Sequence, residues 1–235
     1  MKRYIDFILA LIALIVSVTI AVIVVRVSVK RNGGSLFPVV EEVSKKKDAK
    51  QTSKTADGGN VVSYNSADED VGTIFIGDSR FVGMDDAVDI ASHDREFCVA
   101  KVGQGYNWLV DTGLDKIEAI RKKNTSLTKW RYVIDLGIND LPNIDKYIAE
   151  YKKISKADPT IQIILVSVNP VKNYKGRSNS DIEDFNDKLI DTGYDYIDTY
   201  TTLKNDGFTS TDGLHYDNET YEKIYDLIEK ALKEL

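Results

Sequence analysis

Cysteine is almost absent from this sequence: Cys98 is the one cysteine among 235 residues. A single thiol excludes an intrachain disulfide, and it excludes a metal site built from several thiolates. An activated thiolate needs electropositive and partly exposed surroundings, whereas Cys98 lies in a short apolar run. We therefore expect Cys98 to be a buried core thiol and not a nucleophile.

Positive charge is also in the minority. Lysine and arginine number 31 against 37 acidic residues, which gives a formal net charge of -6. Binding to nucleic acid needs clustered lysine and arginine. The one basic run, residues 45–47, lies in a polar tract that we interpret as solvated. No nucleic-acid partner is expected.

One apolar run is long. Residues 7–25 carry no charge, and about 19 residues are enough to cross a bilayer core of ~30 Å. The run is longer than the apolar part of a signal peptide and is followed by no small-x-small cleavage site, so we favour an uncleaved signal anchor over a cleaved signal peptide. Basic residues lie on both sides of it: Lys2, Arg3, Arg26, Lys30 and Arg31.

Those flanking charges leave the orientation undecided by the positive-inside rule. The very short N-terminal tail favours a single-pass membrane protein with its C-terminal domain outside the cell. Residues 32–70 are polar and rich in Lys, Ser, Asp and Gly, which predicts a flexible linker. The predicted organisation is thus a tail and anchor over 1–31, a linker over 32–70 and a folded domain over 71–235.

The folded domain alternates short apolar runs with amphipathic stretches. This pattern predicts an α/β fold with a parallel sheet that is covered by helices on both faces. The predicted strands are 73–76, 97–101, 132–135, 161–168 and 196–197. The predicted helices are 80–91, 108–122, 143–157, 181–191 and 219–235. Ligands of such sheets bind at the carboxyl ends of the strands.

Residues suited to chemistry follow several of these strands. Ser79 comes after the first strand, and a serine hydroxyl becomes a good nucleophile once a base takes its proton. Histidine suits that task at neutral pH. Of the two histidines, His93 lies in a polar turn, whereas His215 has Asp212 three residues before it. That carboxylate can orient the imidazole and stabilise its charged form.

Acyl transfer also needs hydrogen-bond donors for the developing oxyanion. Three candidates follow the first three strands: the backbone N–H of Ser79, a backbone N–H at Gly103, and the side-chain amide of Asn139. Glycine permits close approach of the backbone to a substrate. Gly105 is the alternative to Gly103 in the same loop.

Taken in order, these motifs resemble the conserved blocks of the SGNH/GDSL hydrolases. Block I is similar to residues 77–80, block II to Gly103, block III to residues 137–140 and block V to Asp212 with His215. The resemblance covers the chain from about residue 71 onward. It implies a three-layer α/β/α fold of flavodoxin-like type and ester hydrolysis without a cofactor. No metal site is expected, because no further His or Cys ligand lies near Asp212 and His215. The resemblance also implies Ser79 as nucleophile, His215 as base, Asp212 as its partner, and an oxyanion hole of Ser79, Gly103 and Asn139.

One departure stands beside the nucleophile. Arg80 occupies the place of the leucine after which the GDSL motif is named. We expect it either to bind an acidic group of a substrate or to pair with Asp78 or Asp85.

The expected activity is that of a serine esterase. An extracellular, membrane-tethered domain lies near cell-envelope glycans, so we expect an acyl-ester substrate such as an O-acetylated glycan. The alternatives on the same fold are an acyltransferase, a lysophospholipase, and an inactive binding or scaffold protein.

Overall fold

The computed structural model describes residues 53–54, 60–64 and 68–235. The predicted signal anchor lies outside these residues, as does most of the predicted linker. In the part of the chain that is described, we find no helix with the length and hydropathy needed to span a bilayer.

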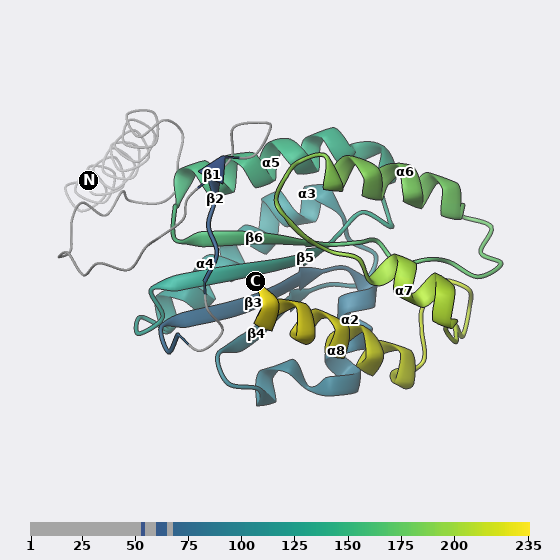
Figure 1. The fold of residues 1–235 in the computed structure, drawn as a ribbon, viewed down its shortest axis with the longest axis horizontal. Coiled ribbons are helices and arrows are strands. Elements are labelled where there is room, and N and C mark those ends of the chain that lie inside the picture. The colour runs from purple at the N-terminus through teal and green to yellow at the C-terminus, as the bar shows by residue number, and fades with distance from the viewer. Residues whose placement is uncertain (1–52, 55–59, 65–67) are drawn as a thin grey trace, which may run out of the picture. The chain divides into compact units, whose positions relative to one another are not determined.

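A parallel sheet of five strands forms the centre of the domain, in the order β4-β3-β5-β6-β7 (Figure 1). All five predicted strands are confirmed, with slightly different ends. Their carboxyl ends share one edge of the sheet, which is where the candidate site residues were expected. The strands are β3 Val71–Gly77, β4 Glu96–Ala100, β5 Lys129–Asp135, β6 Ile161–Val166 and β7 Asp195–Ile197.

Helices cover both faces of this sheet. On one face α2 (Ser79–Val88), α7 (Thr199–Asp206) and α8 (Asn218–Glu234) pack against the sheet. The opposite face is covered by α3 (Tyr106–Trp108), a π-helical turn (Leu109–Gly113), α4 (Leu114–Lys123), α5 (Ile144–Ala157) and α6 (Asn179–Ile190). The chain therefore has the predicted three-layer α/β/α architecture. Short 3₁₀ turns lie at Ile90–Ser92 and Leu141–Asn143.

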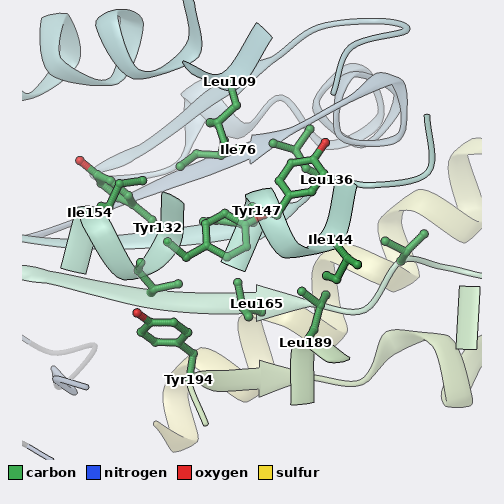
Figure 2. Packing of buried hydrophobic residues seen from close by; sticks show 14 of the residues in the cluster. Ile76, Leu109, Tyr132, Leu136, Ile144, Tyr147, Ile154, Leu165, Leu189 and Tyr194 are labelled. Carbon is green, nitrogen blue, oxygen red and sulfur yellow. The ribbon is translucent and has the colours of Figure 1, made fainter. Parts of the chain in front are cut away.

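Alternation along the strands produces the two cores. Ile74 and Ile76 of β3 point into the cluster under α4, α5 and α6, whereas Phe75 between them joins the cluster under α2 and α8. Successive side chains of a strand face opposite sides of the sheet, so strands buried on both faces are apolar throughout. Figure 2 shows part of the larger cluster, in which Tyr132 and Tyr147 lie among aliphatic side chains.

The folded part begins before residue 71, so the predicted end of the linker is wrong. Val62 and Tyr64 are buried, and the Tyr64 hydroxyl donates to the Pro159 carbonyl at 3.3 Å. Arg131 of β5 donates a hydrogen bond to the Tyr64 carbonyl. Two valines and a tyrosine in a polar tract give no clear periodic signal, but the burial of Val62 and Tyr64 anchors residues 60–64 to the domain. Nearby, β1 (Ser53–Lys54) and β2 (Asn60–Val61) form a small antiparallel pair.

Candidate active site

Ser79 lies where β3 meets α2. The strand ends at Gly77, and the Asp78 side chain caps the helix by accepting the backbone N–H of Arg80 at 3.0 Å. Gly77 is required by the tightness of this turn, because a Cβ there would lie 2.5 Å from Phe81. Ser79 is the first residue of α2, so its backbone N–H has no partner within the helix. The turn thus presents both a hydroxyl and an unpaired N–H at the carboxyl edge.

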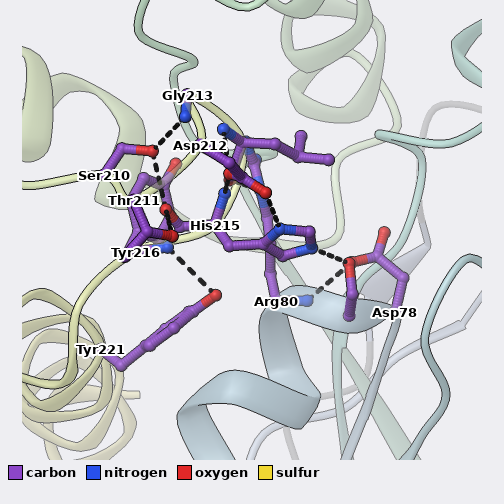
Figure 3. Close-up of polar contacts among 11 residues, drawn as sticks. Asp78, Arg80, Ser210, Thr211, Asp212, Gly213, His215, Tyr216 and Tyr221 are labelled. Atoms are coloured by element: carbon purple, nitrogen blue, oxygen red, sulfur yellow. Dashed lines mark hydrogen bonds and ion pairs between the residues drawn. The ribbon is translucent and has the colours of Figure 1, made fainter.

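His215 lies directly against this serine. Its Nε2 is 2.9 Å from the Ser79 Oγ, and its Nδ1 is 2.7 Å from a carboxylate oxygen of Asp212 (Figure 3). A carboxylate can only accept, so the proton of the neutral ring is held on Nδ1 and the lone pair of Nε2 faces the hydroxyl. The structure therefore brings together all three residues of the predicted triad.

Asp212 also organises the backbone around the ring. Its second oxygen accepts the N–H groups of Leu214 at 2.8 Å and His215 at 2.7 Å. The backbone N–H of His215 is the main reason that the pKa of Asp212 falls to about 2, and the bonds from the His215 ring and from Leu214 lower it further. The carboxylate therefore stays ionised throughout the neutral and mildly acidic range.

These residues belong to a loop that carries its own hydrogen bonds, residues 210–216, which we name the histidine loop. Ser210 pairs with Tyr216, and its hydroxyl donates to the His215 carbonyl at 2.7 Å while accepting the Gly213 N–H at 2.8 Å. Gly213 has φ +89°, and a Cβ there would lie 2.4 Å from the Lys172 carbonyl oxygen. Glycine is needed here for both reasons, so the loop has one well-defined path.

The three predicted oxyanion donors follow neighbouring strands. Gly77 of β3 pairs with Ala100 of β4 and Asp135 of β5. Each of these three strands is followed within a few residues by one predicted donor: Ser79, Gly103 or Asn139. The topology therefore places all three donors at the same edge of the sheet. The Asn139 side-chain amide donates to the Gln104 carbonyl at 2.7 Å, which ties the loop after β5 to the loop that contains Gly103.

The two glycines of that loop differ in their surroundings. Gly103 has φ +70°, is exposed, and has open space where a Cβ would lie. A Cβ at Gly105 would lie 2.5 Å from the Asp140 carboxylate, which accepts the Tyr106 N–H at 2.9 Å and the Tyr147 hydroxyl at 2.6 Å. Close packing against Asp140 accounts for Gly105, whereas Gly103 remains on the open side of the loop.

Two buried carboxyl groups lie beside the turn that carries the serine: Asp78 within the turn, and Asp135 at the end of the neighbouring strand β5. Asp78 and Asp135 are fully buried, and in the described part of the chain one oxygen of each has no hydrogen-bond partner. Burial raises the pKa of Asp78 to about 6, and it raises the pKa of Asp135, which the neighbouring Asp78 raises further. Asp135 follows the apolar residues of β5 as many strand-end residues do, so its proximity to Asp78 could not be predicted from the sequence.

The burial and contacts of Arg80 contradict both expectations that were drawn for it from the sequence. Its side chain is only 2% exposed, so it does not face a substrate. Among the described residues its donors contact the backbone carbonyls of Asn169, Pro170 and Leu214, and no carboxylate. The expected ion pair with Asp78 or Asp85 is therefore not formed.

The remaining sequence candidates lie away from this edge. His93 is exposed, and its Nδ1 lies 3.0 Å from the Tyr225 hydroxyl. Cys98 on β4 is half-buried at the rim of the core instead of fully buried as expected. Its partial burial raises the pKa of the thiol, which keeps it protonated.

Solved structures described as an SGNH hydrolase and as a member of the lipolytic G-D-S-L family share this three-layer fold. Three solved structures carry the comparison. The C-terminal catalytic domain of Streptococcus pneumoniae peptidoglycan O-acetyltransferase A, solved with a methylsulfonyl adduct, is 19% identical, with a TM-score of 0.51 over 69% of this chain and 92% of that one.

The other two have similar scores. A candidate SGNH hydrolase from Slackia heliotrinireducens is 14% identical, with a TM-score of 0.52 over 68% of this chain and 97% of that one. A member of the lipolytic G-D-S-L family from Veillonella parvula is 14% identical, with a TM-score of 0.50 over 70% of this chain and 100% of that one. No family model and no curated protein matches the sequence. At these identities the comparisons establish the fold.

Proposed function

We propose that this protein is a serine-dependent hydrolase of carboxylic esters. The observation that carries the proposal is the chain of short contacts from Asp212 through His215 to Ser79, at 2.7 and 2.9 Å. The four sequence motifs of the SGNH/GDSL hydrolases and the shared fold support it. An inactive scaffold would have no need to keep the base within hydrogen-bond distance of the nucleophile.

In the first half of the reaction, the Ser79 Oγ attacks the ester carbonyl carbon while His215 Nε2 takes the hydroxyl proton. The Asp212 carboxylate holds the ring and stabilises the imidazolium that forms. When the tetrahedral intermediate collapses, the carbon–oxygen bond to the alcohol breaks and His215 gives its proton to the leaving oxygen. The acyl group then remains on Ser79.

The developing oxyanion is bound by preorganised donors. We assign them to the backbone N–H groups of Ser79 and Gly103 and to the side-chain amide of Asn139. The amide of Asn139 has two N–H bonds, and the one bonded to the Gln104 carbonyl fixes the plane of the group. The other is then free to bind the oxyanion without reorganisation.

In the second half, an oxygen nucleophile attacks the acyl carbon and His215 takes its proton. The bond between the acyl carbon and the Ser79 Oγ then breaks, and His215 gives the proton back to that oxygen. Water as that nucleophile gives hydrolysis, and an alcohol gives acyl transfer. Acyl transfer to a sugar hydroxyl is our second candidate, because one structure with this fold is a peptidoglycan O-acetyltransferase catalytic domain.

The substrate we propose is an O-acetyl ester on a cell-envelope glycan. The site is open to solvent: the side chains of His215 and Asp212 are 35% and 52% exposed. An open site suits a small acyl group carried on a large polar polymer better than it suits a long acyl chain. A single-pass anchor that holds the domain outside the cell, as proposed from the sequence, would bring it to such a polymer.

The test uses the full-length chain in mild detergent, with p-nitrophenyl acetate, p-nitrophenyl octanoate and O-acetylated peptidoglycan as substrates. We expect acetate release that disappears in Ser79→Ala and persists in Ser92→Ala, a control at an exposed serine. Turnover that survives in Ser79→Ala would refute the proposal. A strong preference for the octanoyl ester would replace the glycan with a lipid, and acetyl transfer to added sugar would favour the second candidate.

A further inference from the structure

A buried arginine immediately follows the nucleophile. The Arg80 side chain is 2% exposed and extends from the first turn of α2 beneath the histidine loop. Its Nη1 donates to the Asn169 carbonyl at 2.6 Å, its Nε to the Leu214 carbonyl at 3.2 Å, and its Nη2 approaches the Pro170 carbonyl at 3.5 Å. All three acceptors are backbone groups on segments far from α2 in the sequence.

These contacts hold the chain on both sides of His215, the proposed base. Leu214 immediately precedes His215, and Tyr216 immediately follows it. Arg80 bonds to the carbonyl of the first, and its guanidinium lies 5.2 Å from the ring centroid of the second. The Tyr216 hydroxyl in turn donates to the Pro170 carbonyl at 2.5 Å. The residues on both sides of His215 are therefore held by one side chain that belongs to the residue after Ser79.

The chemistry of arginine suits this position. Its planar fork carries five donors in fixed directions, whereas a lysine has three donors on one rotatable ammonium and a leucine has none. Burying a cation is costly unless it is paired and hydrogen-bonded. Here the charge of Arg80 also acts on the buried carboxyls of Asp78 and Asp135, where it opposes the rise of each pKa. The carbonyl and carboxyl groups around Arg80 therefore compensate for the burial of its charge.

We propose that Arg80 is a positioning residue that fixes the distance between the base and the nucleophile. This inference rests on the proposed function, because it assigns Arg80 to the same site. The Ser79 backbone and the guanidinium belong to adjacent residues, so any bond from Arg80 to the histidine loop sets where His215 lies relative to the hydroxyl. Arg80 itself does not touch the reacting atoms.

The inference predicts a specific kinetic defect. Misplacing a catalytic group by about 1 Å can cost on the order of 100-fold in rate. We expect Arg80→Leu and Arg80→Lys to lower kcat by roughly 10- to 100-fold and to leave KM nearly unchanged. Arg80→Lys keeps the charge near Asp78 and Asp135, so it tests geometry even if Arg80→Leu fails to fold.

Arg131 provides a matched control. It is also buried, and it donates to Gln162 at 3.2 Å and to the Tyr64 carbonyl, but these contacts lie at the amino ends of the strands. Arg131→Leu and Arg131→Lys should lower the melting temperature and leave kcat unchanged. A general loss of stability would affect both pairs of variants alike.

The experiment uses the full-length chain and measures two quantities: hydrolysis of p-nitrophenyl acetate, and the rate at which methanesulfonyl fluoride labels Ser79, followed by mass spectrometry. Slow labelling and low kcat in Arg80→Lys, with neither defect in Arg131→Lys, supports the positioning role. Wild-type rates in a folded Arg80→Lys overturn it while the proposed function stands. A wild-type protein that neither hydrolyses the ester nor is labelled at Ser79 overturns the proposed function itself.

Discussion

Each histidine of the chain lies in a trio with a hydroxyl and a carboxylate, and the two trios lie at opposite edges of the parallel sheet. At the carboxyl edge the trio is Asp212, His215 and Ser79, with the imidazole in the middle. At the amino edge His93 lies 3.0 Å from the Tyr225 hydroxyl, which donates to Glu96 at 2.7 Å. The same three kinds of group are present, but the hydroxyl is in the middle of the second trio.

The order of the groups decides what each trio can do. A base must present a lone pair to the hydroxyl while its other nitrogen is held by the carboxylate, and only the trio of His215 has this order. Tyr225 gives its proton directly to Glu96, and burial, together with Glu96, raises the pKa of the tyrosine. The phenol therefore keeps its proton and links α8 to β4. Proximity of a histidine to a hydroxyl is not sufficient evidence of catalysis.

Replacing the two histidines tests this comparison with the largest expected effect. We expect His215→Ala to lower kcat for p-nitrophenyl acetate by at least about 10³-fold, since triad residues act as a unit. His93→Ala should stay within about twofold of the wild type, because exposed side chains outside the site contribute little. Steady-state hydrolysis at pH 7.5 measures both. Comparable losses in the two variants would show that the order of groups does not distinguish the trios.

The next largest effect on kcat is expected at Asn139, a proposed oxyanion donor. Asn139→Ala removes one preorganised donor and should lower kcat by roughly 10²–10³-fold, with a small effect on KM. Asn143→Ala is the control, because that side chain donates to the Asp140 carboxylate at 3.0 Å and is not one of the proposed oxyanion donors. Equal kinetics for Asn139→Ala and the wild type would remove Asn139 from the oxyanion hole.

The smallest effect concerns two carboxyl groups, the buried Asp135 at the carboxyl edge and the half-buried Glu229 at the amino edge. A pKa that is raised in the folded protein means that the folded state binds the proton more tightly than the unfolded chain, so stability falls as the pH rises from about 4 through the folded pKa. Burial raises the pKa of Asp135 at the carboxyl edge and that of Glu229 at the amino edge, the latter to about 6.

Asp135→Asn and Glu229→Gln remove these ionisations. Each should therefore raise the melting temperature at pH 8 and change it little at pH 4, at about 2–4 °C for each kcal/mol in a domain of this size. Thermal unfolding at the two pH values measures the difference. A larger gain at pH 4 than at pH 8 would contradict the direction of the pKa shifts.

Local signals made much of the fold predictable. Ile161–Val166 is apolar except for Gln162, and it forms the strand β6 that such a run predicts for a sheet buried on both faces. The face of α8 with Tyr221, Ile224 and Ile228 was visible from its helical spacing, and these residues are buried. The triad could be proposed because the residues that follow parallel strands meet at one edge.

What the sequence could not reveal depends on contacts between distant segments. Helix α7 was not predicted, because most of its eight residues are threonine or polar and too few apolar residues remain to show a helical period. Burial of Tyr64 depends on the Pro159 carbonyl and on Arg131 of β5. The acceptors of Arg80 lie 89 to 134 positions away along the chain, and they are backbone carbonyls, which every residue has.

The distance in sequence between Ser79 and His215, 136 residues, has a consequence for how the protein is made. The histidine loop is held by α8, since the Tyr221 hydroxyl accepts the N–H of Tyr216 and the Tyr221 ring packs on Gly83 of α2. At roughly 5–20 residues per second, a ribosome needs on the order of ten seconds to reach His215 after Ser79 has been added. Throughout that interval the nascent chain carries an inert hydroxyl, and reactivity arises only when the segment through α8 has been synthesised and has docked.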